Sequence, residues 1–99
     1  MDYNGDATVT ADGTQYTCRA NLRSGHEGVR TPQGETLRGL VWWRGVLTLD
    51  DSGAFWDVGQ ANNLLLRIGE RESSFIVDDA TERGVRITGN GAPPFGPQA

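Results

Sequence analysis

The longest apolar stretch of the chain, Leu40–Leu49, carries hydrophobic side chains at both odd and even positions. Side chains alternate across a β-strand, so such a stretch has two apolar faces, and Trp42 and Trp43 face opposite sides. Both faces need cover, and we therefore expect this stretch to be the central strand of a sheet. Its interior residue Gly45 predicts a sharp bend or the close approach of another backbone.

Shorter segments of alternating apolar and polar residues predict the other strands. The clearest is Thr14–Arg23, whose even-numbered residues from Tyr16 to Leu22 face the core and place Cys18 there as a small buried hydrophobe. Further strands are expected at Ala7–Thr10, Asn62–Ile68, Ser73–Asp78 and Val85–Gly89. Short strands separated by turn signals, with essentially no helix, are typical of an all-β fold. We expect a small meandering antiparallel β-barrel or sandwich of about six to eight strands.

Three segments lack this alternation. Ser24–Gly39 is rich in glycine and polar residues and is expected to be a long loop, and long loops inside compact domains are often functional. Ala54–Ala61 has apolar residues at helical spacing interrupted by a glycine, which predicts a short turn or a single helical turn that packs Phe55 or Trp56 against the sheet. The tail, residues 91–99, contains three prolines and cannot pair as a central strand, but Phe95 can dock it on the barrel.

Length and charge limit the function classes. Ninety-nine residues make one domain, and 13 acidic against 9 basic residues give a surface that repels phosphates, so we expect no nucleic-acid partner. All basic residues are arginines, which excludes Schiff-base and lysine-base chemistry. A single cysteine excludes an intrachain disulfide. The first residues resemble no signal peptide and no run approaches the ~18 residues of a membrane span, so we expect a cytoplasmic protein without a membrane partner.

Four stretches of the chain together resemble a known family. They are Tyr3–Ala7, Leu22 with Gly25-His26-Glu27, Gly34 ahead of Trp43-Arg44-Gly45, and Val85–Phe95 with its Gly-x-Gly-x-Pro-Pro-Phe ending. The chain resembles the domain of unknown function 4873, a small, mostly actinobacterial domain that occurs alone or at the C-terminus of flavin-dependent monooxygenases. This resemblance implies a context in bacterial specialised or oxidative metabolism and brings no established activity.

The only histidine is the sharpest catalytic candidate, because the unperturbed pKa of histidine lies near neutrality. His26 is followed directly by Glu27, and Asp57 is a further carboxylate that could assist it. Adjacent residues of an extended backbone point apart, so the alternative is that His26 is a structural or surface residue. The acidic residues, the histidine and the cysteine show no zinc or calcium ligand spacing, and we expect neither metal nor cofactor.

The aromatic residues Tyr16, Trp42, Trp43 and Trp56 suggest an apolar pocket in a barrel mouth, where Arg44 would fix an anionic or carbonyl group of a ligand. The alternative is that these side chains fill the core. One of the two adjacent tryptophans must lie on the outer face, where the tail, a second copy in a homodimer, or a flavoenzyme would cover it.

We therefore expect an accessory barrel that binds a small molecule, apolar or polyketide-like, or a partner flavoenzyme, in oxidative tailoring of bacterial specialised metabolites. One alternative is a cofactor-independent isomerase, cyclase or hydrolase of a polyketide-like substrate that uses His26 with Glu27 or Asp57. The other is a structural homodimerisation domain.

Overall fold

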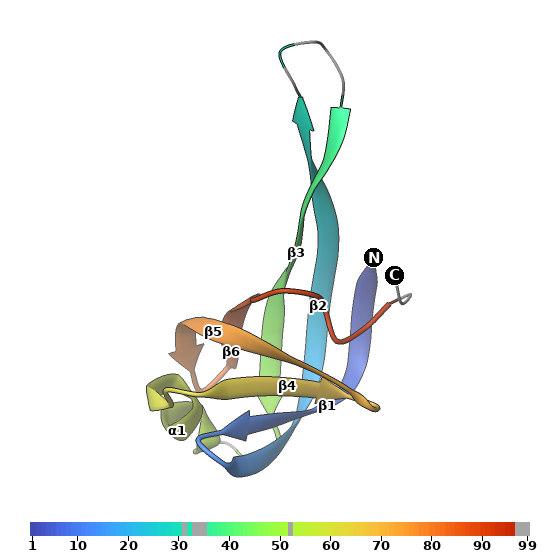
Figure 1. Cartoon of the computed structure of the whole chain (residues 1–99). Coiled ribbons are helices and arrows are strands. Elements are labelled where there is room, and N and C mark those ends of the chain that lie inside the picture. The colour runs from blue at the N-terminus through green and yellow to red at the C-terminus, as the bar shows by residue number, and fades with distance from the viewer. Residues whose placement is uncertain (31, 33–35, 52, 97–99) are drawn as a thin grey trace.

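The structure, a computed structural model, describes residues 1–30, 32, 36–51 and 53–96, without the side chains of residues 26–30 and 36–40. Six strands and one helix follow each other along the chain (Figure 1). They are β1 (Asp2–Ala11), β2 (Thr14–Arg30), β3 (Thr36–Leu49), α1 (Ala54–Gln60), β4 (Leu64–Ile68), β5 (Arg71–Thr81) and β6 (Gly84–Gly89). No helix in this described part is long and apolar enough to cross a membrane.

The strands form a closed antiparallel barrel in the order β1-β2-β3-β6-β5-β4, which confirms the predicted all-β barrel. Two three-stranded meanders, β1-β2-β3 and β4-β5-β6, are joined by α1 and meet along the β3–β6 and β1–β4 pairs. Each short connection follows a turn signal that the sequence carries, such as Asp12-Gly13 with both residues at positive φ. Closure pairs every strand with two neighbours, although β1 pairs with β4 only through Thr8–Ala11.

The interior is filled by side chains from every strand. The largest fully buried ones are Trp43, Leu22, Leu47, Leu66, Ile87, Val9, Val58, Val85 and Pro94. Cys18 is 2% exposed, as the alternation of β2 predicts. Burial also raises the pKa of its thiol to about 12, with nearby Asp50 and Asp6 adding to the shift, so this cysteine is a core residue and a poor nucleophile.

Gly45 confirms the expectation of a close backbone approach. It lies opposite Leu22 in the β2–β3 pair, and a Cβ placed on it would lie 2.1 Å from the carbonyl oxygen of Asn21 and 2.8 Å from the Cα of Leu22. Real Cβ atoms do not come this near to a backbone, so only glycine allows β2 and β3 to approach each other as they do here.

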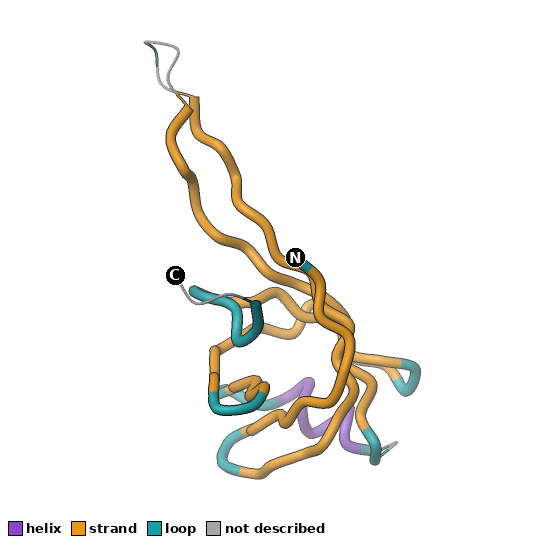
Figure 2. The backbone as a smooth tube through the Cα atoms, turned by 90° about the vertical axis from the view of Figure 1, so that its right-hand side faces the viewer, coloured by secondary structure: helices purple, strands orange, loops and turns teal. Residues whose placement is uncertain are grey.

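The predicted loop over residues 24–39 is wrong, because most of it continues β2 and β3. The two strands pair beyond the barrel through Gly28–Arg38, Val29–Leu37 and Arg30–Thr36, after a register shift between His26 and Gly28. This extension, residues 26–30 of β2 and 36–41 of β3, is called the arm below, and it projects away from the barrel (Figures 1 and 2). A two-stranded ribbon without a core beneath it needs no alternation of apolar and polar residues, and alternation was the signal that the sequence analysis relied on.

The short helix α1 covers one end of the barrel. Ala54 and Val58, four residues apart, are 2% and 0% exposed, and Phe55 packs partly buried beside them. Trp56 points away from this face and is 64% exposed, so of the two predicted anchors only Phe55 packs on the sheet. Gly59 brings the helix close to β5, since a Cβ there would lie 3.0 Å from the Cβ of Ala80.

The proline-rich tail docks on the barrel, as expected, with Pro94 fully buried and Phe95 5% exposed. The Phe95 ring lies edge-on to the indole of Trp43, 6.4 Å between centroids, and 5.9 Å from the ring of Tyr3. The Arg71 guanidinium donates to the carbonyl of Pro93 (2.9 Å), and further side-chain donors hold the neighbouring tail carbonyls. The tail therefore covers the inner tryptophan, Trp43, and not the outer one.

Candidate functional site

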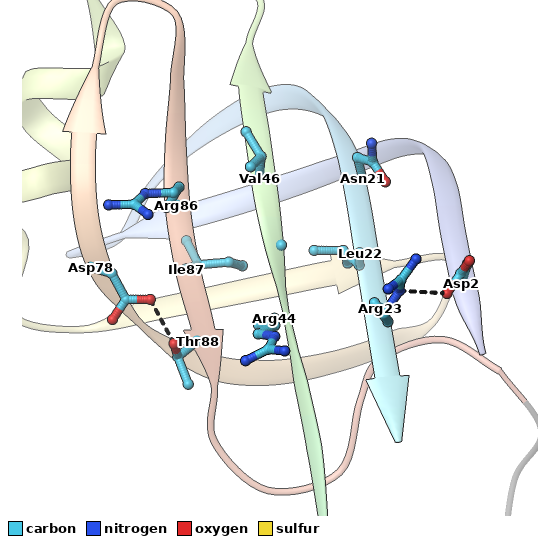
Figure 3. A pocket seen from close by; sticks show the side chains of 11 residues that line it. Asp2, Asn21, Leu22, Arg23, Arg44, Val46, Asp78, Arg86, Ile87 and Thr88 are labelled. Carbon is cyan, nitrogen blue, oxygen red and sulfur yellow. Dashed lines mark hydrogen bonds and ion pairs between the residues drawn. The ribbon is translucent and has the colours of Figure 1, made fainter. Parts of the chain in front are cut away.

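Three arginines project from neighbouring strands on the outer face of the barrel: Arg23 of β2, Arg44 of β3 and Arg86 of β6 (Figure 3). Arg44 lies directly opposite Arg23 on one side and Thr88 on the other. Between these side chains runs a groove of about 540 Å³ that crosses the strands, with Asp2 near one end and Asp78 near the other. We call this the arginine groove.

Trp42 holds Arg44 in place. The Cζ atom of the Arg44 guanidinium lies 4.9 Å from the centroid of the indole, which is a cation–π contact. The indole also covers Gly25, the residue opposite Trp42, where a Cβ would lie only 2.6 Å from Cζ2. A second hollow of about 320 Å³, lined by Trp42, Trp43, Arg44 and Thr88, adjoins this contact. The sequence analysis placed Trp42 and Arg44 in one binding site, and in the structure the two side chains contact each other.

Neutralisation of the arginines is uneven. Nε of Arg23 lies 3.4 Å from Oδ1 of Asp2, and both side chains are about 70% exposed, so this ion pair is weak. An η nitrogen of Arg86 lies 3.7 Å from Oδ2 of Asp79, again in solvent. Within the part of the chain whose side chains are described, Arg44 has no carboxylate within ion-pair distance. Its charge is therefore available to a ligand.

Asp78 is engaged at its end of the groove. The hydroxyl of Thr88 donates a hydrogen bond of 2.6 Å to Oδ2 of Asp78 (Figure 3). The Thr88 hydroxyl is thereby used as a donor inside the protein, and the side-chain donors left for an anion in the groove are the arginine guanidinium groups and the amide of Asn21.

The four aromatic residues predicted to share a pocket do not lie together. Trp43 is fully buried in the core, where its Nε1 finds no hydrogen-bond partner among the described residues, whereas Trp42 lies outside and Trp56 is exposed on α1. Tyr16 is half-buried near α1. The barrel interior therefore has no aromatic ligand pocket built from these four side chains.

Tyr16 and Asp57, predicted for different roles, contact each other. The phenol of Tyr16 donates to Oδ2 of Asp57 at 3.4 Å, and partial desolvation together with the carboxylates of Asp57 and Asp51 raises the pKa of Tyr16. His26 is ten residues further along β2, roughly 33 Å away along an extended strand, and Figure 1 shows α1 and the arm at opposite ends of the molecule. Asp57 is therefore too far away to assist His26.

The side chains of His26 and Glu27 lie outside the described residues, although their backbone is part of the arm. Within the described part of the chain, no group of three or more His, Cys, Asp or Glu side chains is arranged to hold a metal ion.

Sequence reasoning missed Arg23 and Arg86 as members of a site. Both stand at outward positions of strands that were predicted correctly, so the alternation carried part of the signal. What places them beside Arg44 is the register of β2 with β3 and of β3 with β6, and the second of these pairings joins strands far apart in the chain.

A family model described as a domain of unknown function, DUF4873, matches residues 1–96. The chain belongs to this family. The resemblance stated from the sequence is thus confirmed, and the match includes all six strands, α1 and the docked tail as far as Gly96. No curated protein and no solved structure matches the chain. The function of this family is unknown, so the functional argument depends on the site.

Proposed function

We propose that this protein is an accessory binding module that docks on a partner enzyme through the outer face around Trp42 and Arg44. The proposal rests on the position of the open space in this molecule. Trp43, Leu47 and Leu66 fill the interior and are each 0% exposed, whereas the arginine groove lies open on the outside. A six-stranded barrel is too narrow to hold both these side chains and a ligand, so binding at the outer face is favoured.

The composition of this face supports a protein partner. Tryptophan and arginine are the residues most enriched at interaction hot spots, and here one of each forms a single stacked unit. Small-molecule sites enclose about 70–90% of their ligand, which an open groove on a convex surface does not do. From the family resemblance we propose a flavin-dependent monooxygenase of bacterial specialised metabolism as the partner.

A second copy of the chain fits this face less well than a different protein. In a two-fold dimer centred on Arg44, the same arginines would meet their own copies across the axis, and like charges would face each other. The arginine groove therefore favours a partner of opposite charge. The hydrolase, cyclase or isomerase hypothesis loses Asp57 as a helper of His26, and no described contact supports it.

The test is to measure the affinity of the purified chain for each flavin-dependent monooxygenase of the source genome, one at a time, by isothermal titration calorimetry. We expect one of them to bind, and we expect Arg44→Ala to weaken that binding about tenfold or more, as loss of a charge-assisted contact does. Arg19→Ala is the matched control, because Arg19 is an exposed, outward arginine of the neighbouring strand β2 that does not line the groove. Equal losses of affinity in both variants would contradict the proposed face.

Sedimentation equilibrium of the wild type and of Trp42→Ala tests the alternative of a homodimerisation domain. A wild-type dimer that dissociates in the variant would show that this face binds a second copy of the chain.

A further inference from the structure

The three arginines of the groove stand in a row that the strand register fixes. Arg23 is opposite Arg44, and Val46, two residues after Arg44, is opposite Arg86. With strands about 4.8 Å apart and a rise of about 3.4 Å per residue, the three Cα atoms follow a diagonal of roughly 12 Å across the sheet. Three like charges are thus aligned on a protein whose net charge is −4.

This row opposes folding. Like charges placed directly opposite each other on one face of an antiparallel pair are destabilising, and Arg23 and Arg44 are such a pair. The partners of Arg23 and Arg86, which are Asp2 and Asp79, are exposed ion pairs of 3.4 and 3.7 Å and offset little of this repulsion. An anionic group bound along the row would offset it, and the free energy gained would appear as affinity.

The side chain of the central arginine, Arg44, is already oriented to bind an anionic group. Its guanidinium lies over the indole of Trp42, and a guanidinium stacked on a ring keeps its in-plane N–H groups free to donate to a carboxylate. Because the Trp42 ring is itself seated over Gly25, Arg44 loses little side-chain entropy when it binds.

We infer that the groove binds an extended segment of the partner enzyme with acidic residues at every second position, an inference that rests on the proposed function. In an extended chain, side chains at i, i+2 and i+4 point the same way, and their Cα atoms span roughly 13 Å, close to the length of the arginine row. Asp2 and Asp78 stand near the two ends of the groove and repel further carboxylates, which limits the acidic positions to about three.

The experiment titrates the isotope-labelled chain with short capped peptides and follows its backbone amide resonances. The probe is acetyl-Glu-Gly-Glu-Gly-Glu-amide. Two peptides serve as controls: Gln-Gly-Gln-Gly-Gln, which has the same spacing without charge, and Glu-Glu-Glu-Gly-Gly, which has the same charge without the alternate spacing. Inorganic phosphate at the same ionic strength tests whether any free oxyanion suffices.

We expect the alternating acidic peptide to shift the amides of Arg44, Val46 and Thr88 in a saturable way, the contiguous acidic peptide to bind more weakly, and the glutamine peptide to leave them unchanged. Arg44→Gln should weaken binding about tenfold, and Arg19→Gln should leave it unchanged. The inference is overturned if no amide of the groove shifts, if both acidic peptides or phosphate bind equally well, or if Arg19→Gln causes the same loss. Exposed surface substitutions of this kind change stability little, so each variant stays folded for the titration.

The two proposals fail in different experiments. If Arg44→Ala abolishes binding of the monooxygenase but no acidic peptide binds, the docking face stands and the acidic-segment inference is wrong. If the alternating peptide binds but the monooxygenase binds Arg44→Ala as well as it binds the wild type, the groove recognises acidic segments and the proposed docking face is wrong.

Discussion

Gly89 is the position at which the structure makes its sharpest prediction about stability. It lies at the end of β6, opposite Phe75, and the indole of Trp43 lies against its Cα. A Cβ placed on Gly89 would lie 1.8 Å from Cε2 and 2.1 Å from Nε1 of Trp43. The Gly89→Ala substitution therefore has to push the ring away by about 1.6 Å before ordinary contact at 3.4 Å is restored.

Displacement of the Trp43 ring lowers the stability of the fold. Trp43 is 0% exposed, and the edge-on ring of Phe95 packs against it. Overpacking a well-filled core costs about 1–3 kcal/mol, and partial displacement of the tail adds to it, so we expect Gly89→Ala to lower the free energy of unfolding by about 3 kcal/mol. Native domains have only ~5–15 kcal/mol in total, so the variant folds but is clearly weakened.

Urea unfolding followed by tryptophan fluorescence measures this effect. With an m-value of about 1–1.5 kcal/mol/M for a chain of this size, the midpoint should fall by about 2–3 M urea. Gly53→Ala is the control, because Gly53 has a φ of −87° that alanine adopts readily, and its nearest neighbour would be 3.6 Å from the new Cβ. This variant should remain within about 0.5 kcal/mol of the wild type.

A second substitution tests the cause. If the clash with the indole is responsible, Trp43→Phe should cost less in the Gly89→Ala background than in the wild type, with a coupling of about 0.5–3 kcal/mol. Strict additivity of the two changes, or a Gly89→Ala protein as stable as the wild type, would refute the packing that places the Trp43 ring on Gly89.

The remaining predictions concern a thiol, a phenol and the tail. Cys18, with its pKa raised to about 12, should resist iodoacetamide at neutral pH in the folded state and react once urea unfolds the chain; rapid alkylation of the folded protein would contradict its burial. Asp57→Asn should lower the pKa of Tyr16 in an ultraviolet absorbance titration. The raised pKa in the wild type means that the fold favours the neutral phenol. The contribution of the neutral phenol to the free energy of unfolding should therefore persist up to ~pH 10 and be lost as the pH rises through the folded pKa. Arg71→Ala, which removes one set of donors to the tail, should lower the melting temperature by about 4–8 °C, and Phe95→Ala by more, in scanning calorimetry; the reverse order would show that hydrogen bonds and not ring packing hold the tail.

Local patterns predict this fold well where one face of a strand meets the core. Alternation placed Cys18 and Leu22 inside. The two apolar faces of Leu40–Leu49 predicted cover on both sides, but only the side of Trp43 meets the core, and Val46 on the outer side is 37% exposed. The same criterion failed for the arm. Neither face of a ribbon that extends beyond the barrel packs on the core, so its sequence needs no alternation of apolar and polar residues. The helical spacing of α1 left open whether Phe55 or Trp56 packs on the sheet; in the structure Phe55 does, beside the buried pair Ala54 and Val58.

The site was only half predictable, for a reason of topology. Trp42 and Arg44 belong to one strand, and alternation alone puts both on the same outer face. Arg23 and Arg86 join them only when the register of three strands is known, and the β3–β6 pair bridges about forty residues of chain. Sequence periodicity reports which face a side chain occupies, but it carries no information on which strand lies next to it.

The two adjacent tryptophans divide their roles between the filled interior and the proposed outer binding face. Trp43 turns inward and, with Phe95 of the tail against its ring, occupies the space that a ligand would need. Trp42 turns outward and uses its ring to orient Arg44. Neighbouring residues of a strand face opposite sides, so one dipeptide both fills the barrel interior and orients an arginine on the outer face. It follows that the proposed binding surface is attached directly to the buried Trp43, and a surface supported by rigid packing binds with less loss of entropy than a loop does.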